Sequence, residues 1–474
     1  FFNDTATTEI YTLSLHDALP ICSTGGASSI GPRGAMTSGY REGVEEPASL
    51  GESRGDARRQ TVAAADRVDD RFRGGRHDAE GPLGTEHERR PGTVGDEHPL
   101  GAAGAQRVHR GGHRGVVFEG MADGAVGFST GLQYVPGTYA KNFEITVLAQ
   151  IAANEGGVYG THMRNEGTAL EAAVKESIQV AYLIDGPVEI SHLKVDSPSQ
   201  WGAASRALKL IDDARKRGLK VQADQYAYTA GSSSLSIRFP SWALAGTPAD
   251  VAKRLTDAAT WSKIKTEMQV MLAERGFTDL AWATVATYRA DPSLNGLTMK
   301  QVAQKLKGAD TADAQLDAAR DMQLAGGASM VYHFMSDDDV KAIMKHPFVS
   351  IASDAGLNTL GQGVPHPRGY GDNARVLGTF VREQHVITLE EAIRKMTSLP
   401  ASILGLKDRG AIKEGMWADL VIFDPATVAD RATFEDPFQY PVGISTVLVN
   451  GTVVLDEGQH TNARPGKVLK RTGA

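Results

Sequence analysis

Four short segments of this chain share one pattern, in which a run of apolar, often β-branched residues leads into a polar residue that can bind a metal or a substrate. They read GGVYGTHM, GPVEISHLK, GLKVQADQY and HPFVSIASD, with the polar residues His162, His192, Asp224 and Asp354. The first three are about 30 residues apart, the length of one strand, one helix and a return loop. Helical patterns such as TALEAAVKESIQVAYLI and AASRALKLIDDARKRG lie between them. This alternation predicts an α/β fold with a parallel sheet.

In a parallel barrel, the carboxyl ends of all strands open on the same face, so residues that are distant in sequence meet there. A single histidine at a strand end is more often a satisfied polar residue than a ligand. Two at matched spacing, His162 and His192, joined by the strand-end Asp354, favour a metal site. Asp224 is as well suited to orienting a neighbour as to binding metal.

Further polar residues follow these strand ends. Lys194 comes two residues after His192, the string DQYAYTAGSSSLS contains Tyr226 and Ser232, and HPRGYG places Arg368 on the loop after the last strand. An ammonium, a guanidinium and a hydroxyl near a metal are the groups that anchor a substrate carboxylate. We therefore expect these residues to bind substrate.

The first quarter of the chain, residues 1–117, has a different texture. From Ser23 to Val117 it is rich in Gly and Arg, poor in large apolar residues and without helical or strand periodicity. Residues 1–22 resemble a translated sequencing adapter, and residues 23–117 fit an out-of-frame translation, with a disordered linker or a basic, His-rich arm as alternatives. We expect this quarter to be disordered or non-native. The same reasoning excludes as metal ligands Cys22, the pair His77 and Asp78, and the pair His109 and His113.

The rest of the chain divides into two predicted domains. Residues 118–403 form the barrel strands and helices, including the strand pattern DGAVGFSTGL. A helical insertion over about 240–326, with runs such as PADVAKRLTDAATWSKIKTEMQVML, is a lid-like subdomain or a helical spacer. Residues 404–474 contain GAIKEGMWADLVIFDP and STVLVNGTVVLDEGQ, which alternate apolar and polar residues around Gly and Asn-Gly turns. That pattern predicts a β-sheet.

Composition narrows the possible partners. The 474 residues are 41% hydrophobic and 23% charged, typical of a soluble globular protein, and the formal net charge of -7 argues against nucleic acid or an anionic membrane as partner. A single cysteine fits a reducing compartment. No apolar run reaches the roughly 18 to 20 residues that cross a bilayer, and the first residues show no secretory signal. The expected location is the cytoplasm.

The motifs together resemble a known family. From about residue 119 onward, the chain is similar to the N-acyl-D-amino-acid deacylases, or D-aminoacylases, of the amidohydrolase superfamily. The matching strings are GAVGFSTGLQYVPG, THMRNE, EISHLK, ADQYAY, ASDAG, HPRGYG, EEAIRKMTSLPASILGLKDRGAIKEGMWADLVIFDP and VLVNG. The resemblance implies a (β/α)₈ TIM-type barrel beside a small β-sandwich, with one or two zinc ions and a small-molecule N-acyl-D-amino acid as substrate.

The resemblance also implies roles for single residues. His162 and His192 correspond to the zinc-binding histidines of the fifth and sixth strands, and Asp354 corresponds to the catalytic aspartate of the eighth. Zinc would lower the pKa of a bound water to about 7, and Asp354 would move the proton to the leaving amine. The residues that match the family's carboxylate-binding set are Lys194, Tyr226, Ser232 and Arg368.

Two departures from the family pattern define the alternatives. The chain contains neither the H-x-H pair of the first strand nor the cysteine ligand of the second-strand region, so the expected barrel is incomplete, with strands four to eight and a C-terminal β-sandwich segment. The favoured function is a zinc-dependent amidase acting on N-acyl-D-amino acids. The alternatives are another amidohydrolase specificity, namely an N-acyl-D-glutamate or D-aspartate deacylase or a cyclic-imide hydrolase, or an inactive fragment that lacks half the metal site.

Overall fold

A parallel sheet forms the centre of the chain. The computed structural model describes residues 11–14, 21–22 and 101–471, with side chains from residue 112 onward. Its main sheet has the order β10-β6-β5-β4-β3-β1-β2, and all neighbours pair in parallel except β1 and β2. The strands are β1 (Tyr11–Ser14), β2 (Ile21–Cys22), β3 (Gly127–Gly131), β4 (Val158–His162), β5 (Val188–Ile190), β6 (Val221–Gln225) and β10 (Val349–Ile351). The predicted α/β class, with five parallel strands from β3 to β10, is confirmed.

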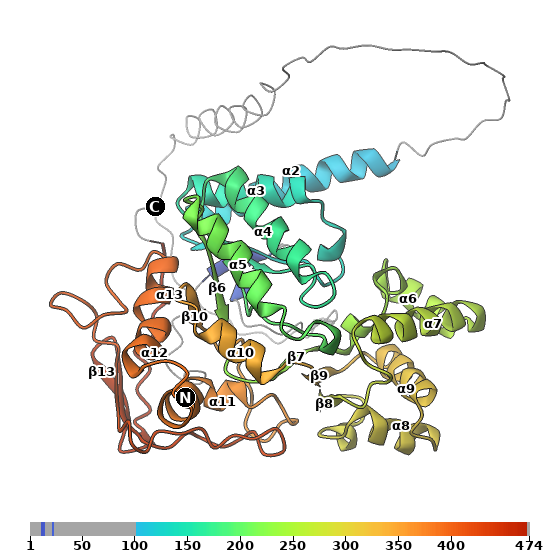
Figure 1. The fold of residues 1–474 in the computed structure, drawn as a ribbon. Helices are drawn as coiled ribbons and strands as arrows, with labels where there is room; N and C mark the ends of the chain where they lie inside the picture. Colours follow the sequence, from blue (N-terminus) through green and yellow to red (C-terminus); the bar gives the residue numbers. More distant parts are fainter. Residues whose placement is uncertain (1–10, 15–20, 23–100, 472–474) are drawn as a thin grey trace, which may run out of the picture. The chain divides into compact units, whose positions relative to one another are not determined.

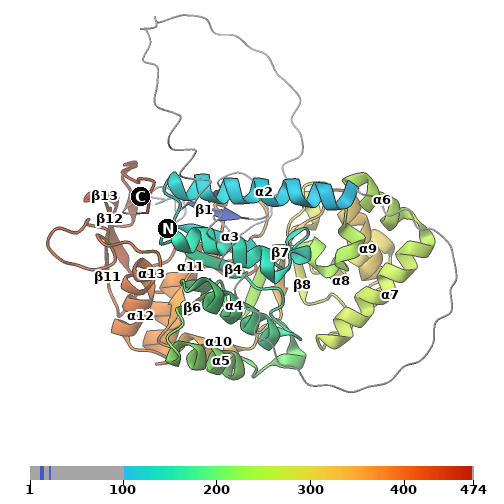
Figure 2. The ribbon, with the colours of Figure 1, turned by 90° about the horizontal axis from the view of Figure 1, so that it is seen from above.

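Helices cover one face of this sheet and connect its strands. Figure 2 shows α2 running alongside α3, and the contacts continue in the order α3, α4, α5 and α10. The bounds are α2 (Gly101–Ala122), α3 (Asn142–Asn154), α4 (Leu170–Ile184), α5 (Ala204–Lys216) and α10 (Asp337–Met344), with η1 (Gly137–Tyr139) and η2 (Pro198–Gln200) in the loops. One crossover helix between successive strands is the arrangement that the sequence spacing predicts.

Side chains alternate between the two faces of the sheet, and only one of these faces packs against the helices. In β5, Val188 and Ile190 belong to the buried core under the helices, so Glu189 between them lies on the opposite face of the sheet. Glu189 pairs with Gly160 of β4 and with Gln222 of β6. Residues two positions apart in a strand share a face, so the side chains of His162 and Asp224 lie on the same face as Glu189. Both candidate residues therefore lie on the face away from the helices.

The expected N-terminal boundary near residue 118 falls inside helix α2. Val117 and Met121, four residues apart, are buried in the core, which explains why the helix crosses the change in sequence texture. Residues 1–117 were expected to be disordered or non-native, but the structure places 11–14 and 21–22 in strands and 101–117 in helix α2. The remaining residues, 1–10, 15–20 and 23–100, lie outside the described residues. The excluded pair His77 and Asp78 also lies there.

The segment between β6 and β10 builds a second, smaller core. Its strands form an antiparallel sheet in the order β7-β9-β8, and its helices α6 to α9 lie together in Figure 1. The bounds are β7 (Ala230–Ser234), β8 (Ala283–Thr287), β9 (Ser329–His333), η3 (Leu235–Arg238), η4 (Ser241–Leu244), η5 (Pro292–Leu294), α6 (Pro248–Thr256), α7 (Ala258–Glu274), α8 (Met299–Lys307) and α9 (Ala312–Leu324). The insertion expected to be helical thus contains strand β8, a five-residue ATVAT run that is rich in β-branched residues.

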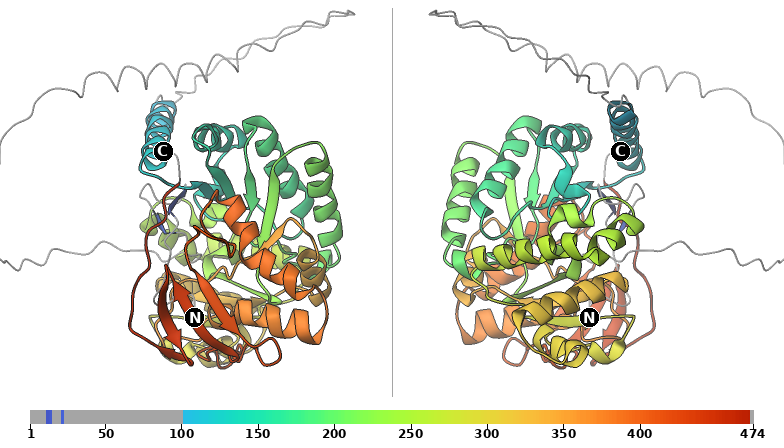
Figure 3. Two further views of the ribbon diagram at one scale, coloured as in Figure 1. Left: turned by 90° about the vertical axis from the view of Figure 1, so that its left-hand side faces the viewer. Right: turned by 90° about the vertical axis from the view of Figure 1, so that its right-hand side faces the viewer.

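The C-terminal region ends in an antiparallel sheet, which confirms the predicted β-structure. Figure 3 shows this sheet beside the helices that follow β10, and its order is β11-β12-β13-β14. The elements are α11 (Arg368–Arg375), the π-helix η6 (Val376–Glu383), α12 (Leu389–Met396), α13 (Ser398–Ile403), β11 (Leu420–Phe423), β12 (Ile444–Val449), β13 (Thr452–Asp456) and β14 (Gln459–His460). Asn450 and Gly451 form the tight turn between β12 and β13, both with positive φ, as the Asn-Gly signal predicts.

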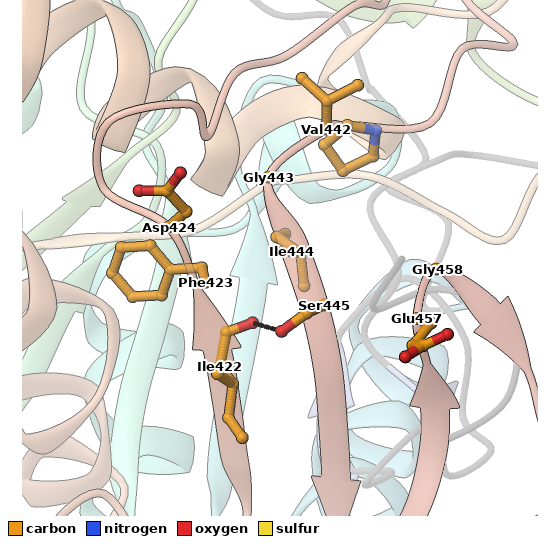
Figure 4. A pocket seen from close by; sticks show the side chains of 10 residues that line it. Ile422, Phe423, Asp424, Val442, Gly443, Ile444, Ser445, Glu457 and Gly458 are labelled. Carbon is orange, nitrogen blue, oxygen red and sulfur yellow. Dashed lines mark hydrogen bonds between the residues drawn. The ribbon is translucent and has the colours of Figure 1, made fainter.

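No helix in the described part of the chain has the length and apolar character needed to cross a membrane. A pocket lies at one end of the C-terminal sheet, lined by the end of β11, the start of β12 and the turn between β13 and β14 (Figure 4). There the Ser445 hydroxyl donates to the Ile422 carbonyl at 3.2 Å. Its lining is largely apolar, with the carboxylates Asp424 and Glu457. None of the predicted site residues lines it, so the candidate site is sought at the strand ends instead.

Candidate functional site

The four polar strand ends occupy the carboxyl edge of the parallel sheet. His162 is the last residue of β4, and Asp224 lies next to the end of β6, whereas His192 and Asp354 follow β5 and β10 in left-handed turns with φ of 41° and 49°. The Asp224 carboxylate accepts a hydrogen bond from the backbone N–H of His192 at 2.6 Å. Asp224 therefore holds the backbone of His192, a contact that suits the first of the two roles considered for it, orienting a neighbour.

The two histidines face each other. His162 Nδ1 and His192 Nε2 are 2.9 Å apart, and the other nitrogens contact oxygens: His162 Nε2 lies 2.7 Å from Gln133 Oε1, and His192 Nδ1 lies 3.1 Å from Glu166 Oε1. If each of these nitrogens donates to its oxygen, two lone pairs point at each other. A cation between the rings would then be stabilised by both lone pairs.

Burial keeps the His162 ring neutral, the form in which an imidazole can bind a metal. Burial lowers the pKa of His162 to about 3, so the ring is neutral at physiological pH. His192 Nδ1 also lies 2.8 Å from the Lys194 ammonium. If Nδ1 accepts a hydrogen bond from Lys194 rather than donating to Glu166, the ring proton is on Nε2, which then donates to His162 Nδ1. The His192 ring can therefore adopt either tautomer without moving, one suited to a free site and one to a loaded site.

Glu166 joins the histidines to Lys194. Its buried carboxylate accepts from Lys194 Nζ at 2.6 Å and contacts both imidazoles, and the ligand atoms of Glu166, His162 and His192 all lie within 4.8 Å of one another. Burial raises the pKa of this carboxyl, but Lys194 and the two imidazoles outweigh it and hold the pKa well below its usual range. Two imidazoles and a carboxylate fit zinc. Glu166 was not among the residues predicted from the sequence, although its position four residues after His162 is a signal that could have found it.

Two of the predicted substrate residues, Arg368 and Lys194, lie against the ring of a third, Tyr226. The Arg368 guanidinium stacks over Tyr226 at 4.5 Å and pairs with Asp354, with Nη1 2.8 Å from Oδ2, and the Lys194 ammonium lies 5.8 Å from the same ring. Burial raises the pKa of Asp354, but Arg368 and the imidazoles outweigh it and lower the pKa below its usual value. The structure thus brings a carboxylate base and two cations together beside the histidines.

Ser232 is placed differently from this group. Its hydroxyl donates to the Met330 carbonyl at 3.0 Å, across the β7–β9 pair. The next residue, Ser233, instead shares a 3.0 Å hydrogen bond with the Tyr134 hydroxyl, and the Tyr134 ring lies 4.8 Å from the His162 ring. Neighbouring strand residues face opposite sides, so the hydroxyl toward the histidines comes from Ser233. The sequence prediction named Ser232 and not Ser233.

Comparisons with known proteins agree with the geometry. Residues 145–455 match the amidohydrolase family. Two proteins of Alcaligenes xylosoxydans xylosoxydans, an N-acyl-D-glutamate deacylase and a D-aminoacylase, are each 36% identical over 74% and 76% of this chain. The chain spans 62% and 64% of their length.

Solved structures give the same likeness. A D-aminoacylase structure is 32% identical with a TM-score of 0.64, covering 77% of this chain and 67% of its own. An N-acyl-D-glutamate deacylase from Bordetella bronchiseptica, solved with zinc and a phosphonate mimic of the tetrahedral intermediate, is 33% identical with a TM-score of 0.63 and covers 77% and 66%. A D-aminoacylase with a binuclear metal centre is similar to the same degree.

Proposed function

Because the chain belongs to the amidohydrolase family, we propose that it is a zinc-dependent hydrolase that cleaves the amide of N-acyl-D-amino acids, releasing a carboxylate and a free D-amino acid. The observation that carries the proposal is the facing pair His162 and His192, with Asp354 and Arg368 beside it. The relatives named as deacylases of D-amino acids support the substrate class. The proposed partner is that small molecule, without nucleic acid or membrane, and the proposed location is the cytoplasm.

We propose roles for the site residues as follows. His162 and His192 hold the metal, which, when bound, lowers the pKa of water and polarises a carbonyl. Asp354 takes a proton from the attacking water and returns it to the leaving amine. Arg368 and Lys194 bind the substrate carboxylate, with the Tyr226 ring between them and Ser232 as the predicted further contact.

The architecture of the intact site is also a proposal. The five parallel strands correspond to strands four to eight of a (β/α)₈ barrel over 118–403, and residues 404–474 to part of a β-sandwich. Of residues 1–117, the described parts belong to β1, β2 and α2, and the rest lies outside the described residues. The pairing of β10 with one neighbour among the described residues, β6, supports an incomplete barrel. An inactive fragment that lacks the H-x-H and cysteine ligands is the alternative to an active enzyme.

A second candidate function is the deacylation of acidic N-acyl-D-amino acids. Arg238, the last residue of the η3 turn that follows β7, is buried, and its Nε and Nη2 atoms have no hydrogen-bond partner among the described residues. Its guanidinium stacks on Tyr332 at 4.5 Å and on Trp282 at 5.3 Å. Because a buried guanidinium favours an anionic partner, Arg238 supports D-glutamate or D-aspartate as the amino acid.

The test is hydrolysis by the zinc-loaded chain. We expect release of free D-methionine from N-acetyl-D-methionine, abolished by His192→Ala and unchanged by His385→Ala, whose position is exposed. Opening of a hydantoin ring without cleavage of any N-acyl-D-amino acid would contradict the proposal and favour the cyclic-imide alternative. Absence of stoichiometric zinc together with absence of hydrolysis would favour the inactive fragment. A preference for N-acetyl-D-glutamate that Arg238→Met reverses would select the acidic substrates.

A further inference from the structure

His366 is a buried histidine that the proposed chemistry does not use. It lies two residues before Arg368, in the loop that leads into α11, and its side chain is 4% exposed. The backbone N–H of Arg368 donates to His366 Nδ1 at 3.0 Å. Since an N–H can only donate, Nδ1 carries a lone pair, and the proton of the neutral ring is on Nε2. That nitrogen lies 2.8 Å from the Ala230 carbonyl, which can only accept. Both contacts therefore require one tautomer.

The two contacts join segments that carry proposed substrate groups. Arg368 is the first residue of α11, and its guanidinium stacks on Tyr226. Ala230 is the first residue of β7, the strand that carries Ser232 and Ser233. Residue 366 is 136 positions from residue 230, so the imidazole is a cross-link between distant parts of the chain.

An aromatic enclosure protects this cross-link. The rings of Tyr228 and Phe434 meet the imidazole edge-on, with centroid distances of 5.2 Å and 5.1 Å, and the Tyr226 ring lies 6.1 Å away. Burial in this enclosure lowers the pKa of His366 well below its usual range. A neutral ring has one donor and one acceptor nitrogen, which is what the Arg368 amide and the Ala230 carbonyl require. Phe434 comes from the C-terminal region, so that region contributes to the packing around His366.

We propose that His366 is a positioning residue for the substrate carboxylate, because its Nε2-protonated imidazole fixes the start of α11 relative to the start of β7. The ring itself contacts neither the predicted metal ligands nor the Arg368 guanidinium in any hydrogen bond of the described residues. It acts through the backbone, by setting where the guanidinium stands over Tyr226. This inference rests on the proposed function for the identity of the ligand, but the tautomer and the cross-link do not depend on it.

Nitrogen NMR of the histidine-labelled protein tests the cross-link directly. We expect the His366 ring to be neutral and protonated on Nε2 from about pH 5 to about pH 8, the range in which an unperturbed histidine changes charge. A ring protonated on Nδ1, or one that becomes doubly protonated in this range, would overturn the proposal. This result does not depend on whether the protein hydrolyses any substrate.

Three variants separate positioning from general folding. His366→Phe removes both contacts, His366→Asn retains an acceptor near the Nδ1 position, and His366→Gln retains a donor near the Nε2 position. For His366→Phe we expect the KM for N-acetyl-D-methionine to rise about tenfold or more, with a much smaller change in kcat, because a small displacement of a binding group is costly. The Asn and Gln variants should each recover part of the loss.

N-acetyl-D-methionine amide is the matched control, because it has no carboxylate for Arg368 to bind. His366→Phe should leave its kcat/KM nearly unchanged. An equal loss on the acid and the amide would show a general structural role and overturn the positioning role, as would an unchanged KM for the acid. If the unsubstituted protein cleaves neither compound, the proposed function fails, and the tautomer measurement alone decides whether the cross-link exists.

Discussion

Asp372 allows the electrostatics around the site to be tested through protein stability. It lies on α11, four residues after Arg368, and its Oδ1 accepts from the Ala227 backbone N–H at 2.7 Å. Its Oδ2 is buried without a hydrogen-bond partner among the described residues. Burial raises the pKa of this carboxyl from 3.8 to about 7. The informative change is Asp372→Asn, which keeps the Oδ1 acceptor and removes the titration.

The direction of the effect follows from proton binding. Between pH 3.8 and about 7 the folded state holds the Asp372 proton more tightly than the unfolded state, so the free energy of unfolding falls as pH rises through this window. A pKa change of this size lowers the free energy of unfolding by at most about 4 kcal/mol, and the full decrease is reached once the pH exceeds the pKa in the folded state. Asp372→Asn lacks this fall, so its stability relative to the unsubstituted protein should increase steadily across the window.

Urea unfolding at several pH values between about 4 and 8, with a chelator present, measures this difference. Asp338→Asn serves as the control because that side chain is exposed. The Asn amide adds a donor where Oδ2 had no partner, which costs a constant amount at every pH, so the slope and not the offset is the test. Stability curves for the two proteins that stay parallel within about 0.5 kcal/mol over the whole range would refute the reasoning.

Three further predictions concern single contacts. Glu166→Gln should lower the free energy of unfolding by about 3 to 5 kcal/mol because it breaks a buried ion pair, and adding Lys194→Met should recover part of the loss in a double-mutant cycle measured in urea. His192→Ala should abolish tight zinc binding in calorimetry, whereas His385→Ala should not; equal affinities in the two variants would contradict the metal site. Gly127→Ala should destabilise the protein by more than about 3 kcal/mol, because a Cβ there overlaps a backbone carbonyl of β4; an unchanged melting temperature would contradict the β3–β4 pairing.

The core strands and their parallel arrangement could be predicted because the signal is local. Each core strand is a short apolar run between helical patterns, and a parallel sheet follows from that alternation. The turn at Asn450 and Gly451 is equally local, because both residues adopt the positive φ that a two-residue hairpin needs. The convergence of His162 and His192 follows from the same geometry, since parallel strands end at one edge.

Other features depend on contacts that no local pattern contains. Whether Ser232 or Ser233 faces the histidines depends on the register of β7 against β9, and a shift of one residue exchanges the two faces. Glu166 lies in a loop, so its contact with Lys194 depends on how that loop returns over the strand ends. Strand β8 is a short run inside a helical region, and it becomes a strand because β9 is available to pair with it.

Two residues at the strand ends, His192 and Asp354, adopt a left-handed backbone conformation. His192 and Asp354 have φ of 41° and 49°, a backbone conformation that costs a non-glycine residue on the order of 1 to 3 kcal/mol. Glycine would remove that cost, but it has no imidazole or carboxylate. Each residue is instead held in place, His192 by Asp224 and Asp354 by Arg368. The fold therefore maintains strain at these two turns, which place an imidazole and a carboxylate at the carboxyl edge of the sheet.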